Sequence, residues 1–224
     1  PKAFVDRINS RNVEGIVAEA VHIDKAIQGV YSGYSVIIDR ISQDVPFYRT
    51  WLKNAALTGT AVINNPFWWS ADDKYFNNCL MTQIGVPVPK TAIIPSNEMP
   101  DDTSADSFSN LAYPLNWDAI FEEVGFPAYM KPFEGGGWKN VYKLNTKEEF
   151  FEKHNETGQL VMLLQEEIVF EEYYRCYCIG GKYVHIMPYE PRNPHHLRYK
   201  CNFNPSPDLR HQMEEIVIRL NQYL

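Results

Sequence analysis

The chain contains 224 residues, of which 45% are apolar and 22% are charged, close to the averages for globular proteins. This composition excludes a mostly disordered chain and supplies enough apolar residues for one large or two small cores. With 21 basic and 28 acidic residues, the formal net charge of −7 argues against a general nucleic-acid-binding protein. No run of about 18 apolar residues is present to cross a bilayer, so we expect no membrane partner. At this chain length and spacing, we expect the four cysteines to be reduced thiols rather than disulfides. Reduced thiols predict a cytoplasmic location.

The first 70 residues predict a small α/β domain. Residues 34–39 and 60–64 have the apolar, β-branched composition of buried strands. Between them, Pro46 is suited to the first turn of a helix. One face of this helix carries apolar residues spaced by four: Phe47, Trp51 and Ala55. The order strand, helix, strand predicts a mostly parallel sheet over residues 1–70.

A different domain is predicted from residue 71 onward. Ser70 precedes a helical pattern and is followed three residues later by Asp73, so we expect Ser70 to cap this helix. Residues 88–94 are extended, and their prolines suit the edge of a sheet. The acidic residues 95–115 predict a surface loop with one helical turn at 108–111, and a lid over a site is the alternative.

The remaining pattern alternates helices with short strands. Asn116, Thr146 and Ser206 each suit the cap of a helix, with Glu149 completing a capping box. The predicted strands lie at 126–131, 141–144 and 160–164, followed by a hairpin over 173–188. The final helix ends at the apolar residue Leu224 without a capping residue, which predicts that the chain is truncated at its C-terminus.

A lysine and three consecutive glycines form the first motif with clear chemistry. Lys131 ends a predicted strand, and the triplet Gly135-Gly136-Gly137 follows it. Glycine backbone can approach phosphate oxygens closely, and a lysine adds a positive charge for the same anion. A tight hairpin would also use such a triplet, but Lys131 and the following Lys139 favour a phosphate-binding loop.

A second motif follows the most apolar strand, where Gln165-Glu166-Glu167-Ile168 leaves the core. A strand that leaves the core can offer an adenine ring a dry slot and backbone partners. Glu172 lies at a suitable distance along the chain to accept hydrogen bonds from a ribose. A solvated acidic face is the alternative interpretation of these carboxylates.

Two further charged residues stand out by their positions. Arg175 lies on a predicted strand beside apolar residues, which indicates either a structural anion or a phosphate chain as its partner. Lys74 lies in the first turn of a helix, where the helix dipole disfavours a cation, so either a function or neutralisation by neighbouring aspartates explains it.

Taken in order, these segments resemble the ATP-grasp superfamily, nearest to the branch of glutathione synthetase and ribosomal-protein S6 glutamate ligase. The segments that carry the resemblance are Asp73-Lys74, Gly85 to Thr91, Gly125-Phe126-Pro127, Lys131-Pro132, Gly135-Gly136-Gly137, Gln165 to Ile168, Glu172 and Arg175. The resemblance is best over residues 64–185. It implies a small Rossmann-like pre-ATP-grasp domain (1–70) and an incomplete two-lobe ATP-grasp domain (71–224), with lobe one over about 71–164 and lobe two from about 165.

The resemblance also implies a role for each of these residues. Lys74 and Lys131 would contact the phosphates of ATP, and the three glycines would form a flexible phosphate lid. Glu166, Glu167 and Ile168 would hold the adenine edge beside Gln165, and Glu172 would hold the ribose. Arg175 would be catalytic, facing the phosphates or the acceptor.

The implied activity is that of an ATP-dependent carboxylate–amine ligase that acts through an acyl phosphate. Its partners would be ATP, a small carboxylate and an amine or amino acid; a homodimer is among the oligomeric states left open. Mg²⁺ is expected as a cofactor because protein cations alone do not balance a triphosphate. Its ligands are expected beyond Leu224, with Glu190 as an alternative. A non-catalytic ATP-binding module and an ATP-grasp small-molecule kinase remain as other functions.

Overall fold

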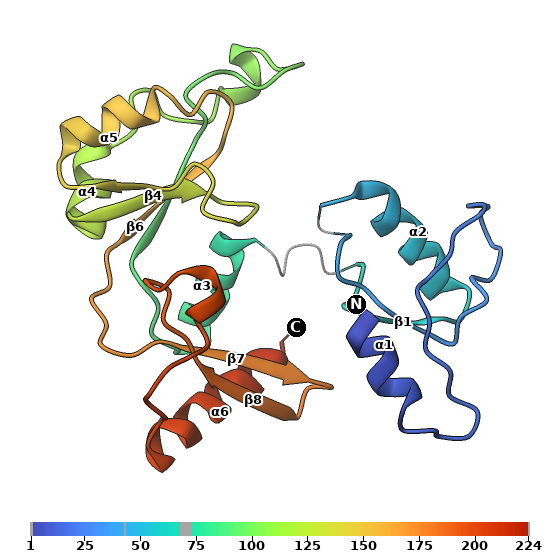
Figure 1. The fold of residues 1–224 in the computed structure, drawn as a ribbon. Coiled ribbons are helices and arrows are strands. Elements are labelled where there is room, and N and C mark those ends of the chain that lie inside the picture. The colour runs from blue at the N-terminus through green and yellow to red at the C-terminus, as the bar shows by residue number, and fades with distance from the viewer. Residues whose placement is uncertain (1, 43, 68–72, 224) are drawn as a thin grey trace. The chain divides into compact units, whose positions relative to one another are not determined.

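The computed structural model describes residues 2–42, 44–67 and 73–223. The chain divides into two compact units, Pro1–Trp69 and Ser70–Leu224 (Figure 1). Each unit has its own apolar core, so the packing of each follows from its own helices and strands.

The first unit contains a strand–helix–strand arrangement, as the sequence predicts. Its elements are α1 (Lys2–Asn9), β1 (Val36–Ile38), α2 (Pro46–Leu57) and β2 (Ala61–Ile63). Strands β1 and β2 are parallel, and α2 connects them with Pro46 in its first turn. The core consists of Ile37, Leu52 and Ala55. The predicted apolar face of α2 is wrong at Phe47, which is 55% exposed, because Leu52 faces the strands instead.

The second unit contains a four-stranded antiparallel sheet. Its strands are β3 (Thr91–Ile94), β4 (Ala128–Pro132), β5 (Tyr142–Leu144) and β6 (Met162–Glu166), in the order β3-β6-β4-β5. Strand β3 lies at the edge, as its neighbouring prolines predict. The helices of this part are α3 (Lys74–Gln83), α4 (Trp117–Val124) and α5 (Lys147–His154).

Helices α4 and α5 lie together on one face of this sheet (Figure 1). The fully buried side chains of Met130, Leu164 and Phe150 meet in the core between the sheet and these helices. The ring of Phe121 on α4 packs edge-on against the ring of Phe150 on α5, with 5.1 Å between the centroids. This aromatic contact joins the two helices, because each ring presents its edge or face to the other at a favoured distance.

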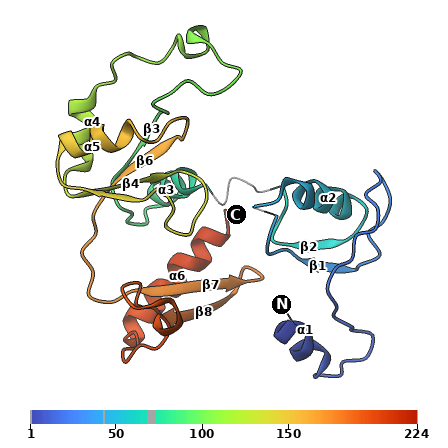
Figure 2. The same cartoon turned by 45° about the horizontal axis from the view of Figure 1, so that its top comes forward.

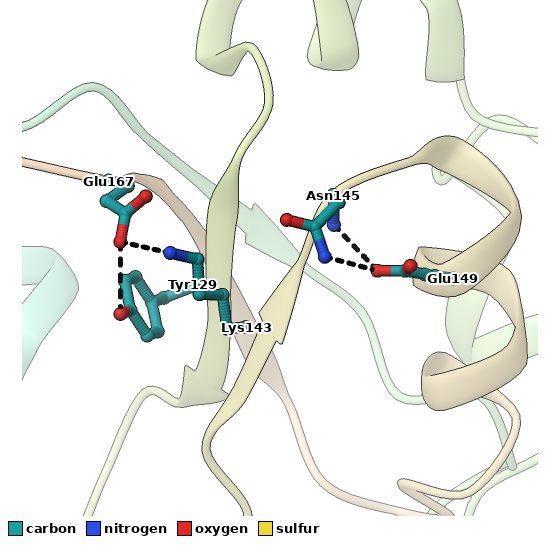
Figure 3. Close-up of polar contacts among 5 residues, drawn as sticks. All are labelled: Tyr129, Lys143, Asn145, Glu149 and Glu167. Atoms are coloured by element: carbon teal, nitrogen blue, oxygen red, sulfur yellow. Dashed lines mark hydrogen bonds and ion pairs between the residues drawn. The ribbon is translucent and has the colours of Figure 1, made fainter.

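Two predicted capping interactions differ in the structure. Asp73 rather than Ser70 caps α3: its side chain accepts hydrogen bonds from two backbone N–H groups of the first turn, and Ser70 lies outside the described residues. Thr146 caps α5 as predicted, but the carboxylate of Glu149 accepts from the backbone N–H and the side-chain amide of Asn145 (Figure 3). The reciprocal half of the capping box is therefore displaced by one residue.

The predicted acidic loop contains a short 3₁₀ helix, η2 (Ala105–Phe108), earlier than the turn expected at 108–111. Ser104 caps it and exchanges hydrogen bonds with Ser107, a pairing that starts the helix before Phe108. The position of a short turn thus follows from this local side-chain pairing rather than from apolar spacing.

The rest of the second unit is a hairpin covered by the last helix. Strands β7 (Tyr174–Ile179) and β8 (Tyr183–Pro188) are antiparallel, and α6 (Pro207–Asn221) packs on them (Figure 2). A short 3₁₀ helix, η3 (His195–Leu197), lies between β8 and α6. Exposure alternates along β7, so that Cys176 faces Met213 of α6 while Arg175 lies on the more exposed side.

The strand register determines which side chains face away from the main core. Met130 on β4 pairs with Leu164 on β6, and both side chains are fully buried in the core. In the adjacent pair, Tyr129 lies one position before Met130 and faces Gln165, one position after Leu164. Since side chains alternate between the faces of a sheet, Tyr129, Lys131 and Gln165 share the face opposite α4 and α5. This second face carries the candidate site.

Candidate functional site

A cavity of about 310 Å³ lies on this second face of the sheet. Lys74, Lys131 and Gln165 line it together with the three glycines of the loop after β4. The remaining lining residues are Tyr129, Pro132, Glu134, Trp138, Lys139 and Val141. The structure therefore brings six of the predicted site residues around a single cavity: Lys74, Lys131, Gly135, Gly136, Gly137 and Gln165.

The glycine loop connects β4 to β5 and has a backbone that requires glycine at two positions. Gly135 and Gly137 have φ values of +77° and +74°, in the left-handed region that side chains with a Cβ rarely adopt. No heavy atom lies within 4 Å of the position of a Cβ added at any of the three glycines. Backbone conformation, and not crowding, is therefore the reason for glycine at Gly135 and Gly137.

Lys74 holds the first part of this loop. Its ammonium group donates hydrogen bonds to the carbonyl oxygens of Pro132, Phe133 and Gly135, at 3.1, 3.2 and 2.8 Å. Its backbone N–H also donates to the Phe133 carbonyl, at 3.3 Å. These contacts use the three N–H donors of a lysine and tie the start of α3 to the loop. Lys74 thus positions the glycine loop as well as supplying charge to the cavity.

Lys131 projects from β4 and is oriented by a chain of side-chain hydrogen bonds. Its ammonium donates to Oε1 of Gln165 at 2.6 Å, and Nε2 of Gln165 donates to the hydroxyl of Thr91 at 2.8 Å. That hydroxyl also accepts from Asn78 and donates to the Pro89 carbonyl. The chain of bonds fixes the direction of the Gln165 amide and therefore the position of the Lys131 ammonium.

Lys74 and Lys131 have pKa values below that of free lysine. Burial is the main cause of the lowered pKa of Lys131, and the positive charge of Lys74 lowers it further. Burial also lowers the pKa of Lys74, although Asp73 and Glu134 oppose this effect. Two desolvated ammonium groups that repel one another are stabilised when an anion enters between them. The cavity is therefore suited to a negatively charged ligand.

The carboxylates at the end of β6 are held by protein partners. Glu167 accepts from Lys143 at 2.6 Å and from the Tyr129 hydroxyl at 3.3 Å (Figure 3), and these hydrogen bonds, chiefly the one from Lys143, lower its pKa. Glu166 accepts from the backbone N–H of Lys90 at 2.8 Å. Neither glutamate lines the cavity, but Tyr129 does, so Glu167 contacts a residue of the cavity wall.

Three more predicted site residues, in addition to the two glutamates, lie outside this cavity. Ile168 follows β6 and is 50% exposed. Glu172 accepts a hydrogen bond from the Tyr174 hydroxyl. Arg175 lines a second cavity, also of about 310 Å³, which shares Gly137 and Trp138 with the first. The structure thus separates Arg175 from the two lysines while placing it beside the same loop.

Comparison with curated proteins gives relatives among ligases, and no protein-family model matches the chain. The D-alanine–D-alanine ligase of Neisseria meningitidis serogroup C is 28% identical over 163 residues, covering 66% of this chain and 46% of the ligase. The D-alanine–D-alanine ligase of Neisseria gonorrhoeae matches to the same extent. The chain spans about half the length of these curated relatives.

Solved structures show the same architecture. The RimK domain ATP-grasp protein of Sphaerobacter thermophilus aligns with a TM-score of 0.62 at 14% identity, covering 98% of this chain and 76% of that one. The chain has an ATP-grasp fold. The D-alanine–D-alanine ligase of Helicobacter pylori aligns with a TM-score of 0.52 at 15% identity, covering 82% of this chain and 52% of the ligase. This fold is the one that the resemblance in the sequence implies.

Some residues that line the first cavity belong to no motif of the sequence. Tyr129 on β4 and Val141, which directly precedes β5, both line the cavity. Alternation from Lys131 could have indicated Tyr129, since residues two apart in a strand share a face. Trp138, which has φ of +65° and is 66% exposed, lines both cavities only because the glycine loop turns between them.

The described residues do not form a site suited to Mg²⁺. Among them, no three His, Cys, Asp or Glu side chains gather where a metal ion could bind. Glu190 is bound by Arg192 through two hydrogen bonds, which together with a backbone bond lower its pKa to about 2. Glu190 therefore already has a cationic partner. In the part of the chain that the structure covers, no helix is both long and apolar enough to span a membrane.

Proposed function

We propose that this chain carries the nucleotide site of an ATP-dependent carboxylate–amine ligase. The observation that carries the proposal is a single cavity lined by two lysines with lowered pKa values and by three consecutive glycines. In such a ligase, the γ-phosphoryl group moves to a substrate carboxylate and ADP leaves. An amine then attacks the acyl carbon, loses a proton, and displaces phosphate.

The residues of the cavity suit the phosphate end of ATP. Lys74, Lys131 and Lys139 line it against a single carboxylate, that of Glu134, so its net charge is positive among the described lining residues. In our proposal, the ammonium of Lys131 donates hydrogen bonds to a phosphate oxygen. Its bond to Gln165 uses one of its three N–H donors and leaves two for a ligand. Backbone N–H groups of the glycine loop would supply further donors.

We place the adenine edge at the end of β6. The backbone N–H groups of Glu166 and Glu167 donate to Lys90 and Pro127, so both are already engaged. The carbonyl of Glu167 and the N–H of Ile168 come next along the chain, and neither forms a backbone hydrogen bond with the described residues. These two groups would read the donor and acceptor of an adenine, and Glu172 would accept from the ribose.

We assign the two units as the sequence predicts. Residues 1–70 would form a Rossmann-like pre-ATP-grasp domain, and residues 71–224 would belong to the ATP-grasp domain, with Arg175 in its second lobe. Mg²⁺ is given no step in the reaction because the described residues lack a set of ligands that fits it. The substrates of this proposed reaction are a carboxylate and an amine.

Calorimetric titration with Mg-ATP tests the nucleotide site. We expect Lys131→Ala to weaken binding by about tenfold or more, because a hydrogen bond to a charged group contributes about 1.5–3 kcal/mol. Lys182→Ala, in the exposed turn between β7 and β8, is the matched control and should bind as the wild type does. Equal affinity of the wild type and Lys131→Ala would refute the site.

Hydroxylamine tests the reaction class. An acyl phosphate formed from a candidate carboxylate would be captured as a hydroxamate, whereas a kinase that acts on a hydroxyl would yield none. ATP binding without ADP formation, over a panel of carboxylates and amines, would favour the non-catalytic alternative.

A further inference from the structure

Two polar residues outside both cavities connect helix α3 to the wall of the first cavity. Asn78 lies on α3 and Thr91 begins β3, and neither lines either cavity. Nδ2 of Asn78 donates to the Thr91 hydroxyl at 2.9 Å, and Nε2 of Gln165 donates to the same oxygen at 2.8 Å. That hydroxyl donates its own hydrogen to the Pro89 carbonyl at 2.9 Å. A threonine hydroxyl has one donor and two acceptor sites, so these three bonds use its full capacity.

The charge of Lys131 determines the direction of each bond in this group. An ammonium can only donate, so it requires Oε1 rather than Nε2 of Gln165, and the two atoms are 2.6 Å apart. Nε2 of Gln165 then faces Thr91, whose oxygen accepts from it. A reversed amide would place N–H groups against the ammonium, and its oxygen against a hydroxyl whose hydrogen is already donated to Pro89. A single orientation of Gln165 therefore satisfies all of these partners.

Strand register brings these side chains to the same face of the sheet. Thr91 on β3 is the direct partner of Gln165 on β6 in their antiparallel pair. Lys131 on β4 is the partner of Leu163, two residues before Gln165, so Lys131 and Gln165 are diagonal neighbours. Direct and diagonal neighbours on one face are within reach of each other through long side chains. The connection from Thr91 to Lys131 therefore crosses three strands and depends on the register of both pairs.

Helix α3 joins this group to the other lysine that binds the glycine loop. Lys74 and Asn78 are four residues apart on α3, so they lie on the same side of the helix. Lys74 donates to three carbonyl oxygens at the start of the glycine loop, whereas Asn78 donates to Thr91. One helix is thus bound both to the glycine loop and, through Thr91 and Gln165, to Lys131. These contacts set the separation of the two ammonium groups.

We infer that Thr91 and Asn78 are positioning residues of the nucleotide site. They line no cavity themselves, and they act by holding the Gln165 amide so that the Lys131 ammonium keeps its place relative to Lys74. The inference rests on the proposed function for the identity of the ligand as a phosphate chain. The state of the Lys131 ammonium, however, can be measured without any nucleotide.

The neutral amide of Gln165 gives this arrangement a measurable consequence. The other charged or titratable side chains that line the cavity with Lys131 are those of Lys74 on α3, Tyr129 on β4, and Glu134 and Lys139 on the glycine loop. A hydrogen bond to the carbonyl oxygen of Gln165 stabilises the ammonium form of Lys131 without cancelling its charge. Loss of this oriented oxygen should therefore lower the pKa of Lys131 further, in the direction that burial and Lys74 already impose.

Trace labelling of lysines with acetic anhydride over a range of pH, followed by peptide mapping, measures the titration of Lys131 in the intact chain. Thr91→Val preserves the shape of the side chain but removes the acceptor for Gln165, so we expect the pKa of Lys131 to fall. Thr91→Ser keeps a hydroxyl and should restore most of the wild-type titration. Lys182, in the exposed turn between β7 and β8, is the internal control and should titrate alike in every variant.

Calorimetric titration with Mg-ATP gives the second readout. Thr91→Val should bind about two- to tenfold more weakly, the factor that corresponds to one neutral hydrogen bond, and Thr91→Ser should recover most of this loss. Asn78→Ala should have a smaller effect in the same direction, because Thr91 then still accepts from Gln165. Gln83→Ala removes an exposed amide from the last residue of α3 and is the matched control, which should bind as the wild type does.

The two readouts separate this inference from the proposed function. An unchanged titration of Lys131 in Thr91→Val would overturn the inference, and so would equal losses of affinity in Thr91→Val and Thr91→Ser. A lowered Lys131 pKa with unchanged affinity for Mg-ATP would instead refute only the proposed role of Lys131 in binding phosphate. Should Thr91→Val not fold, Asn78→Ala gives the same test, and a Lys131 titration no different from that of Gln83→Ala would overturn the inference.

Discussion

Substitution of a single glycine tests whether the conformation of the loop matters for the site. Gly135 has φ of +77°, and an added Cβ would meet no atom within 4 Å. The cost of Gly135→Ala therefore comes from the backbone alone, about 1–2 kcal/mol for an L residue in the left-handed region. That energy lowers the population of the native loop by about 5- to 30-fold. Nucleotide binding that requires this loop should weaken by a similar factor.

Gly136→Ala provides the matched control. Gly136 lies next in the chain, lacks a positive φ, and also has open space around the added Cβ. We expect its affinity for Mg-ATP to stay within about twofold of the wild type by calorimetry. The hydrogen-exchange rate of the loop amides is a second measure. This rate should rise in Gly135→Ala and stay unchanged in Gly136→Ala. Equal effects of the two substitutions would refute the argument from backbone conformation.

Three further predictions concern the elements that support the site. Asp73→Ala removes the cap of α3 and should cost about 0.5–2 kcal/mol in denaturant unfolding, and Asp73→Asn should recover most of it. Phe150→Ala empties a fully buried position and should cost about 3–5 kcal/mol, against much less for Phe151→Ala, which is 39% exposed; similar losses would contradict the assigned core. The pKa of Lys131 is lowered in the folded chain, so the unfolded chain binds its proton more tightly. The stability of the wild type relative to Lys131→Met should therefore rise with pH between the folded value and the ordinary value of 10.5, as melting curves over this range would show; a fall would contradict the assigned direction.

Local patterns predicted the ends of several elements correctly. Asn116 caps α4 through a hydrogen bond to the N–H of Ala119, and Ser206 caps α6 in the same way. The Gly180-Gly181 turn connects the predicted hairpin, and both glycines have positive φ. These features depend on side chains and backbone within a few residues, so their signals are contained in short segments of sequence.

Predictions that depend on a distant partner are less complete. Lys74 stands out in the sequence for its unfavourable place in a helix, but its three carbonyl acceptors lie about sixty positions later in the chain. The acidic pair at the end of β6 suggests contacts with adenine, whereas Glu167 is bound to Lys143 on β5 and Tyr129 on β4. Such contacts arise from strand register, which pairs residues according to the whole sheet.

The amino-acid sequence alone identified the lysines, the glycine loop and the strand that together form the cavity, because each needs a residue type suited to its local conformation or charge. Folding of the second unit determined that Lys74, Lys131 and Gln165 meet on one face of a sheet, and that Asn78 is connected to Gln165 through Thr91. Side chains that are remote along the chain come together only when strands pair and helices pack. The electrostatics of the first cavity is therefore a property of the tertiary structure.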